Sequence, residues 1–441
     1  MVERADVVVI GAGIGGLSAA FHLAVRHGLG RVVIVDPRPP LTLTSDKSTE
    51  CYRNWWPSRS MVGLMNRSID LLEEMRWESD DAFGLNRRGY LYVTADPANL
   101  RAMTEQAGQT SSFGAGAVRS HPGPHPYGPA EDGVDILSPA ELAAHFPYVT
   151  GDAVGAVHVR RAGWFSAQQL GAWMLDRSRQ HGATLVRAEM LGIDVTRDRV
   201  SGVVLSDGST IETPVVVAAA GPHSVRVAAS AGVELPLFSE LHLKVAFRDH
   251  LGIIPREAPM MIWSDPQRIE WSPEEQDELR MMGRRDLLAE MPVFCHGRPE
   301  GGPESPYFLA LWEYHREVLE PVWPIPDDPL YSEVVMRGLT TMVPGLAAYL
   351  DRLPEATVDG GYYTKTTENR PLIGPAGPDG FHLVAGLSGF GVMVAAGAGD
   401  LVARHVIGSD LPHYAGAFLL SRYEDPRYLE EMADRADSGQ L

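Results

Sequence analysis

Residues 6–36 read DVVVIGAGIGGLSAAFHLAVRHGLGRVVIVD. A run of four apolar residues predicts a strand buried on both faces, and the glycine pattern Gly11-x-Gly13-x-x-Gly16 follows it directly. Beyond the glycines, apolar residues recur at helical spacing, and residues 31–36 predict a second buried strand. The stretch therefore predicts a strand, a helix and a second strand packed as one unit.

Each glycine of this unit has a steric role. Gly11 permits the tight turn, Gly13 leaves room for a pyrophosphate beside the backbone, and Gly16 lets the helix pack on the strand. The helix start presents N–H groups and the positive end of its dipole to phosphates. Asp36 ends the second strand, 20 residues after Gly16, where a carboxylate accepts hydrogen bonds from both ribose hydroxyls. The unit predicts a dinucleotide site and leaves NAD and FAD as alternatives.

Length and composition narrow the class of protein. A chain of 441 residues is too long for one small core, so we expect two domains. The net charge of −19, without a basic stripe, argues against a nucleic-acid partner. Cys51 and Cys295 are too few for a disulfide framework, which favours a cytoplasmic location. Glycines interrupt the first apolar run, and no stretch of about 18 apolar residues occurs, so we expect neither a signal peptide nor a membrane span.

A second glycine-rich helix start lies near the other end of the chain. Residues 381–385 predict a buried strand, and GLSGFGVMVAAGAG at 386–399 opens a helix that extends to about Ile407. The positive end of this helix can stabilise negative charge that develops elsewhere on the same cofactor. A reduced flavin carries such charge on its pyrimidine ring, whereas nicotinamide gains none on reduction. The two helix starts together favour FAD.

The pattern of strands predicts the domain organisation. Strands buried on both faces recur in distant segments, which indicates one parallel sheet, whereas residues 236–354 carry separate strands around an acidic helical insert. We predict an α/β protein: a Rossmann-like FAD-binding domain with a central parallel sheet, and a substrate cap domain built on a largely antiparallel sheet. We predict that the FAD-binding domain is discontinuous and comprises residues 1–83, 140–235 and 355–441. The cap comprises the intervening residues 84–139 and 236–354.

Two segments of the predicted cap carry local signals. Residues 84–94 alternate tyrosine with aliphatic residues, which predicts a hairpin at a sheet edge. Residues 107–135 are rich in Gly, Pro, Ser and His and predict a mobile loop. His121 and His125 are four residues apart there, but a Pro-rich stretch cannot hold a helical metal-binding pair, so we expect no metal site.

These motifs together resemble the FAD-dependent oxidoreductases of the D-amino-acid oxidase type, in particular their sarcosine oxidase, dimethylglycine dehydrogenase and glycine oxidase branch. The resemblance implies that a C–N bond is oxidised by hydride transfer to the flavin, giving an imine that water hydrolyses. It spans nearly the full chain and is carried by Gly11–Gly16 with Asp36, the segment 45–53, Ala220-Gly221, YTKTTENRPLIG at 363–374, and Gly386-x-Ser-Gly389-x-Gly391.

The resemblance also implies which residues bind the cofactor. Those at its ADP half are Gly11, Gly13, Ile14, Gly15, Gly16, Asp36, Pro37 and Arg38. Those along its middle, at the adenine or at the pyrophosphate are Ser45, Lys47, Ser48, Met190, Ala220 and Gly221. Those at the edge of the flavin pyrimidine are Gly389, Phe390, Gly391, Val392 and Met393.

The expected substrate clamp is only partly present. Arg53 matches an arginine that grips the substrate carboxylate in the sarcosine oxidase branch. The family places a second cation either where this chain has Tyr363 or where it has Met393, and Lys365 is a possible substitute. Because a two-cation clamp holds amino acids, its partial loss favours a secondary or tertiary amine or a modified amino acid over a free α-amino acid.

Covalent attachment and oxygen activation also depart from the family pattern. Gly361 stands at the family's flavin-linking cysteine position and no histidine lies in 42–53, so we expect non-covalent FAD, with Cys51 as the one remaining candidate for a link. The cap strand 307–315 lacks the lysine that activates oxygen in sarcosine oxidases, which leaves Lys244. Oxygen and another electron acceptor remain alternatives.

Chemistry at an amine requires that its nitrogen be unprotonated, and several cap residues could accept the proton. The candidates are His242, His296, Tyr314 and His315. We expect Arg53, Tyr363, Lys365, His242 and Lys244 to form the catalytic set. The alternatives are a flavoenzyme that oxidises 2-hydroxy acids or alcohols and a flavoprotein assembly partner without turnover; the oligomeric state is left open.

Overall fold

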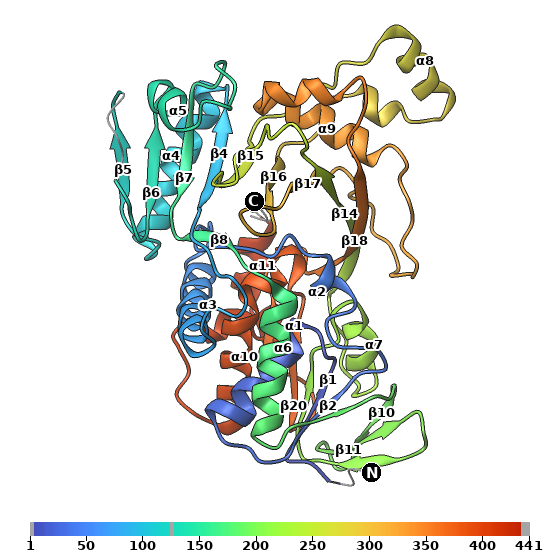
Figure 1. The fold of residues 1–441 in the computed structure, drawn as a ribbon. Coiled ribbons are helices and arrows are strands. Elements are labelled where there is room, and N and C mark those ends of the chain that lie inside the picture. The colour runs from blue at the N-terminus through green and yellow to red at the C-terminus, as the bar shows by residue number, and fades with distance from the viewer. Residues whose placement is uncertain (1–3, 124–127, 434–441) are drawn as a thin grey trace.

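A computed structural model describes residues 4–123 and 128–433. Figure 1 shows two lobes, each built around its own sheet, with the chain passing between them several times. The first lobe holds a six-stranded sheet and the second a nine-stranded sheet. The mixed α/β fold class predicted from the sequence is confirmed.

The six-stranded sheet has the strand order β19-β20-β13-β1-β2-β9. All pairs are parallel except β19 with β20, which is antiparallel. This is the predicted parallel sheet, assembled from segments as distant as residues 7 and 385. In sheet order the strands are Leu372–Pro375, Phe381–Ala385, Val216–Ala218, Val7–Ile10, Val32–Val35 and Thr184–Val186.

Both faces of this sheet are covered, which explains why its strands are apolar on both sides. Val7 and Val9 of β1 face a helical layer, and Val8 and Ile10 face the small sheet β10-β11-β12 together with α7. The helical layer consists of α1 (Ile14–Phe21), α3 (Arg59–Glu78), α6 (Ala167–Gln180) and α10 (Gly391–Ile407). On the other face lie β10 (Met190–Val195), β11 (Val200–Leu205), β12 (Thr210–Glu212) and α7 (Ser224–Ala229).

In the part of the chain that the structure describes, one helix is long and apolar enough to cross a membrane by length and composition alone. It runs over Ser388–Ile407 with a mean hydropathy of 1.4, but 72% of this window is buried inside the molecule. Its helix α10 packs between α1 and α3 (Figure 1). Its apolar composition therefore serves the core of the first lobe.

The nine-stranded sheet has the order β18-β14-β17-β16-β15-β4-β7-β6-β5. Its pairs are antiparallel except β15 with β4 and β5 with β6, so it is the largely antiparallel sheet predicted for the cap. In sheet order the strands are Ala356–Lys365, Phe238–Arg248, Tyr307–Leu311, Cys295–Glu300, Met260–Trp263, Tyr90–Thr94, Gly155–Val159, Val134–Leu137 and Val118–His121.

The prediction of an edge hairpin at 84–94 is wrong. Only β4 forms there, and it lies inside the sheet between β15 and β7. All five of its side chains are buried. Its parallel partner, β15, comes from residues about 170 positions later in the chain. Local alternation could not reveal that partner.

The predicted loop at 107–135 is partly regular. Helix α4 (Pro97–Ser112) extends into it, and β5 and β6 pair at the far edge of the sheet. His121 contacts Asp135 and Glu141, while His125 lies outside the described residues. Within residues 4–123 and 128–433, no group of three or more His, Cys, Asp or Glu side chains is arranged to hold a metal ion.

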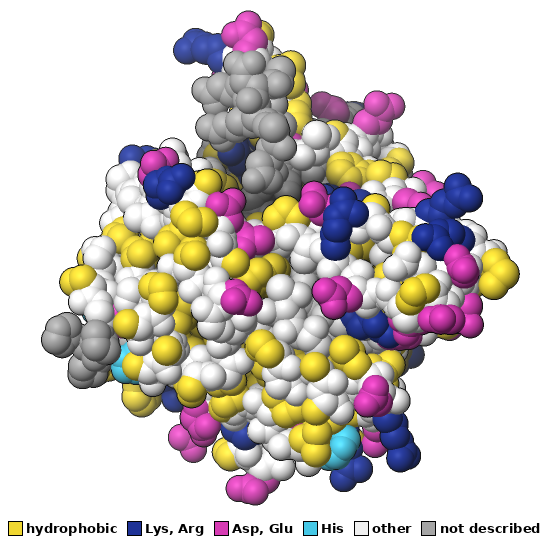
Figure 2. All heavy atoms as spheres, turned by 90° about the horizontal axis from the view of Figure 1, so that it is seen from above, with side chains coloured by type: hydrophobic (Ala, Val, Ile, Leu, Met, Phe, Trp, Pro, Cys, Tyr) yellow, Lys and Arg dark blue, Asp and Glu magenta, His cyan; other side chains and the backbone are white. Residues whose placement is uncertain are grey.

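Helices close the outer side of the second lobe. Helix α9 (Tyr331–Met342) packs its apolar stripe on the sheet, where Val335 and Met336 share a core with Cys295 and Trp312. Others are α5 (Pro139–His145) and α8 (Pro273–Met281), each begun by a serine capping box. On the face shown in Figure 2, basic and acidic side chains are interspersed with apolar ones.

Two strands lie outside the lobe suggested by their sequence ranges. Strands β7 and β18 fall within the ranges assigned to the FAD-binding domain, yet both pair within the nine-stranded sheet. Strand β18 pairs with β14 along its whole length, and its end at Lys365 leads into the first lobe. The last residues of β18 therefore lie where the two lobes meet.

Candidate functional site

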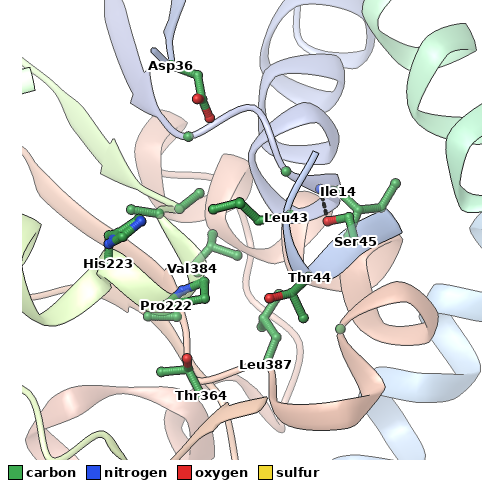
Figure 3. Close-up of a pocket in the computed structure, with 18 of the residues that line it drawn as sticks. Ile14, Asp36, Leu43, Thr44, Ser45, Pro222, His223, Thr364, Val384 and Leu387 are labelled. Carbon is green, nitrogen blue, oxygen red and sulfur yellow. Dashed lines mark hydrogen bonds between the residues drawn. The ribbon is translucent and has the colours of Figure 1, made fainter. Parts of the chain in front are cut away.

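A cavity of about 640 Å³ opens at the carboxyl ends of β1, β2 and β13, where parallel α/β sheets bind their ligands. This volume is typical of a site for a cofactor or a drug-sized ligand. Figure 3 shows its wall, to which Ile14 and Ser45, His223, and Val384 and Leu387 contribute from separate segments. We call its two extremes the Asp36 end and the Tyr363 end.

The first glycine motif forms one wall of this cavity. Gly11 has φ of +109°, and a Cβ there would collide with the carbonyl group of Ala219. A Cβ at Gly16 would collide with the carbonyl oxygen of Gly11, so this glycine sets the packing of α1 on the strand. At Gly13 a Cβ would meet only the Ser45 hydroxyl, at 3.3 Å. The turn is therefore tight on its inner side and open on the cavity side, which fits a pyrophosphate against the start of α1.

Asp36 is held rigidly at its end of the cavity. Its Oδ2 accepts a hydrogen bond from the Ala12 N–H at 2.8 Å, and its Oδ1 accepts one from the Arg38 N–H at 2.8 Å. Figure 3 shows the carboxylate projecting from the end of β2. Met190 and Arg226 line the same cavity. A fixed carboxylate with acceptor capacity left over suits the two hydroxyls of a ribose.

The Tyr363 end is built from β18 and the start of α10. Tyr362, Tyr363 and Thr364 line it together with Gly389 and Gly391. A Cβ at Gly389 would collide with the ring of Tyr363, so a side chain there would displace the tyrosine. The two glycine-opened helix starts, about 375 residues apart in sequence, thus face one cavity.

Most of the residues that the resemblance implies for the cofactor line this cavity. They are Gly11, Gly13, Ile14, Gly15, Asp36, Pro37, Arg38, Ser45, Ser48, Met190, Ala220, Gly221, Gly389, Gly391 and Val392. Gly16 lies behind the turn. The ammonium group of Lys47 lies 2.6 Å from Asp46 and 2.8 Å from Asp359 and does not line the cavity.

A second, smaller cavity of about 30 Å³ adjoins the Tyr363 end, because Tyr363 and Gly389 line both. We call it the Arg53 cavity; its remaining lining residues are Thr49, Arg53, Tyr90, Met260, His296, Glu313, Phe390 and Met393. Arg53 is 2% exposed, its guanidinium lies 4.4 Å from the centre of the Trp56 ring, and its Nε donates to the Trp55 carbonyl at 3.3 Å. A buried arginine held on an aromatic ring is suited to bind a carboxylate.

A line of ionisable groups lies behind the Tyr363 ring. The His242 ring stacks on that of Tyr363 with 3.9 Å between centroids. The Nε2 of His242 lies 3.2 Å from Glu240 Oε2, and its Nδ1 lies 3.7 Å from Glu313 Oε1. Lys365 Nζ lies 2.6 Å from the same Glu240 oxygen. Burial opposes ionisation of Glu240, but its hydrogen bonds with His242 and Lys365 lower its pKa overall.

Lys244 follows His242 by two positions on β14, so its side chain lies on the same face of the cap sheet, and it reaches toward the first lobe. Its ammonium donates to the carbonyl oxygens of Asp46 at 3.2 Å and Ser48 at 2.9 Å, and burial lowers its pKa. Of the five predicted catalytic residues, the fold brings Arg53 and Tyr363 to a cavity wall; His242, Lys365 and Lys244 line neither cavity.

Several lining residues were not among the sequence candidates. Thr44 lies in the polar segment that precedes Arg53, and Leu387 lies inside the second glycine motif, so both had a nearby signal. Glu313 had only a weak one: it is an acidic residue directly after the apolar run YFLALW. For His296 the sequence indicates only a possible proton acceptor. The structure places it on the wall of the Arg53 cavity, where burial lowers its pKa.

The two lobes, the glycine-lined cavity between the helix starts and the buried arginine beside it are typical of a dinucleotide-dependent enzyme. A family model described as "FAD dependent oxidoreductase" (DAO) matches residues 6–405. The chain belongs to this family, which confirms the family predicted from the sequence and establishes an FAD-dependent oxidoreductase.

Individual relatives agree with this assignment. The chain is 25% identical over 275 residues to "Sarcosine oxidase subunit beta" of Arthrobacter sp., covering 57% of this chain and 63% of that one. It is 28% identical over 262 residues to "Sarcosine dehydrogenase, mitochondrial" of Homo sapiens, covering 57% of this chain and 26% of that one. The matches thus span less than two thirds of these curated relatives.

Solved structures share the fold over nearly the whole chain. An L-proline dehydrogenase from P. horikoshii has a TM-score of 0.75 at 20% identity and covers 96% of this chain and 99% of its own. A glycine oxidase from Geobacillus kaustophilus has a TM-score of 0.74 at 17% identity, with coverage of 95% and 99%. At these identities the likeness shows the fold alone.

Proposed function

We propose that this enzyme oxidises a C–N bond of a secondary or tertiary amine or of a modified amino acid, giving an imine that water hydrolyses. The observation that carries the proposal is the Arg53 cavity, in which a buried guanidinium lies beside the Tyr363 end of the large cavity. FAD bound in the large cavity would accept the hydride. The names of the relatives, which include sarcosine oxidase and sarcosine dehydrogenase, support an amine as the substrate.

The chain's own residues would bind and orient the substrate. Arg53 would hold a carboxylate, and Tyr363 would separate the two cavities as a flat wall. His242, Lys365 and Lys244 would act through neighbouring groups, because each contacts the backbone or side chains behind a cavity wall. The buried apolar and aromatic surroundings of Arg53 exclude water and strengthen an ion pair with the substrate.

We propose that FAD is held without a covalent link. Cys51 is buried, its thiol lies 3.1 Å from the Thr49 carbonyl oxygen, and burial raises its pKa. It lines neither cavity, so its thiol does not reach a cofactor site in the described part of the chain. Both cysteines are free thiols, which is in keeping with the cytoplasmic location that we propose.

Anaerobic reduction of the purified yellow protein tests the function. We expect N-methyl amino acids or cyclic imino acids to bleach the flavin absorbance band. Bleaching by 2-hydroxy acids but not by amines would select the alternative of hydroxy-acid oxidation, and a flavin that no small reductant reaches would favour an assembly partner without turnover. Admitting air to the reduced protein then distinguishes oxygen from another acceptor by the rate of reoxidation.

A further inference from the structure

The Arg53 cavity contains a carboxylate as well as a guanidinium. Glu313 follows directly after β17 and Trp312, and it lines this cavity together with Arg53. Its side chain is only 16% exposed. A cavity that contains both an anionic and a cationic group is matched to a ligand that carries both charges.

His242 lies behind this carboxylate. The His242 side chain is 2% exposed, and its Nδ1 is a buried nitrogen without a hydrogen-bond partner in the described part of the chain. This nitrogen lies 3.7 Å from Glu313 Oε1, just beyond hydrogen-bond distance, whereas Nε2 lies 3.2 Å from Glu240. The anionic Glu240 is in turn 2.6 Å from the Lys365 ammonium. A line of alternating charged and polar groups therefore ends at Glu313, on the cavity wall.

We propose that Glu313 binds the positively charged nitrogen of the substrate while Arg53 binds its carboxylate, so that the enzyme selects small zwitterionic amines. This inference rests on the proposed function, because it places the substrate where the Arg53 cavity adjoins the Tyr363 end of the large cavity. This chain has Tyr363 and Met393 where the family places a second cation that binds the substrate carboxylate. With Glu313 in the cavity wall, the site instead binds both charged ends of the molecule. Tyr363 and His296, which also line the cavity, contribute no formal charge, since burial raises the pKa of Tyr363 and lowers that of His296.

The same carboxylate has a role in preparing the amine. When the substrate nitrogen carries a proton, its N–H bond breaks, the bonding electron pair stays on nitrogen as the lone pair, and the proton moves to an Oε of Glu313. The products of this step are a neutral amine and a neutral carboxyl group. His242 Nδ1, facing Glu313, is placed to share that proton.

A pair of isosteric probes tests the charge preference without turnover. Trimethylglycine and 3,3-dimethylbutanoate have the same shape, but only the first carries a positive charge, and its quaternary nitrogen has no lone pair to oxidise. We expect the holoenzyme to bind trimethylglycine at least 10-fold more tightly, measured by the perturbation of the flavin absorbance band. Glu313→Gln should abolish that preference and leave the affinity for 3,3-dimethylbutanoate equal or higher, which shows that the cavity is intact.

Glu317→Gln is the matched control, because it removes the same charge from an exposed position four residues away. It should retain the preference of the unaltered protein. A holoenzyme that does not prefer trimethylglycine, or a Glu313→Gln variant that keeps the preference, would overturn the proposal. Failure of the amine panel to bleach the flavin would instead remove the proposed function, so the two failures are distinguishable.

Glu240 is a positioning residue in this scheme, since it acts on Glu313 through His242. Glu240→Gln should reduce the preference for trimethylglycine by a smaller factor than Glu313→Gln, and Glu240→Asp, which keeps the negative charge, should restore it. A role limited to folding would change the affinities for both probes alike. Equal changes for both probes, or no rescue by aspartate, would remove Glu240 from the scheme.

Discussion

Arg53 shows how one side chain is prepared for binding before any substrate arrives. Its guanidinium lies 4.4 Å from the centre of the Trp56 ring and 5.6 Å from that of Tyr90, and it is almost fully buried. The stacked rings hold the planar group in one orientation, so little side-chain entropy remains to be lost on binding. Lysine has neither the planar fork nor the stacking surface.

We therefore predict that Arg53→Lys weakens binding of 3,3-dimethylbutanoate by about 10- to 100-fold, the range expected when a charge-assisted hydrogen-bonded pair is lost. FAD content and thermal stability should change little, because a cation is retained. Spectral titration of the holoenzyme measures the affinity. An unchanged affinity for the acid would exclude Arg53 as the carboxylate-binding residue.

Asp36 has an equally specific expectation at the opposite end of the large cavity. Its carboxylate is oriented by the N–H groups of Ala12 and Arg38, both at 2.8 Å. Asp36→Asn replaces one acceptor oxygen by a donor, so we expect FAD to bind about 10-fold more weakly. Titration of the apoprotein with FAD, followed by flavin fluorescence, measures this. Asp176→Asn on the exposed side of α6 is the control, and equal affinities of the two variants would contradict the assignment.

At the scale of elements, side chains from two strands of the cap sheet bind the backbone of one segment of the first lobe. Lys244 on β14 binds the carbonyl oxygens of Asp46 and Ser48, and Arg298 on β16 binds that of Thr49 at 3.0 and 2.7 Å. The segment from α2 (Thr44–Lys47) to the start of β3 (Cys51–Arg53) is thus fixed by the buried Arg298 and the half-buried Lys244. It carries Ser45 and Ser48, which line the large cavity, and leads to Arg53.

Lys244→Met separates a positioning role from a role in oxygen chemistry. If the ammonium mainly fixes the segment, FAD affinity should fall about 10-fold, since two charge-assisted hydrogen bonds are lost, while the reduced flavin reoxidises at its former rate. If Lys244 activates oxygen, reoxidation should slow and FAD affinity should hold. The contacts with Asp46 and Ser48 lead us to expect the first result. Unchanged FAD affinity would contradict that expectation.

At the scale of the whole molecule, three buried histidines couple stability to pH. Burial is the main cause in each case: it lowers the pKa of His22 to about 3 and that of His158 and His382 to about 4, from an ordinary value of 6.5. Unfolding releases these imidazoles into water, where they bind protons below pH 6.5. The unfolded state then binds more protons than the folded state, so acid favours unfolding.

We predict that the free energy of unfolding is fully maintained above pH 6.5 and falls as pH is lowered from 6.5 to 4, by up to about 1.4 kcal/mol per pH unit for each of the three histidines. Urea denaturation at a series of pH values, at fixed FAD concentration, measures this slope. His22→Leu, which fills a site that is 0% exposed, should flatten the slope by about a third. A free energy that is constant across this range would contradict the prediction.

Several features of the fold followed from local sequence and others did not. Strand β20 has the predicted bounds and helix α10 ends at the predicted residue, because apolar runs flanked by turn residues mark such elements directly. The position of β4 inside the sheet did not follow, because its parallel partner β15 is far away in sequence. The same limit applies to β7 and β18, whose place in the nine-stranded sheet depends on remote pairing.

The sequence by itself determined the dinucleotide motif, because its residues lie close together in the chain, and it indicated the family and Arg53 as a substrate-side candidate through short motifs, each of which is local in sequence. Only the tertiary structure decided that Glu313 lines the Arg53 cavity, that His242 stacks on Tyr363 and that Lys244 holds the backbone of another lobe. Charge and packing act over a few ångströms in space, whereas these residues are separated by more than a hundred positions along the chain. Their grouping exists only when the two sheets have brought their strand ends together.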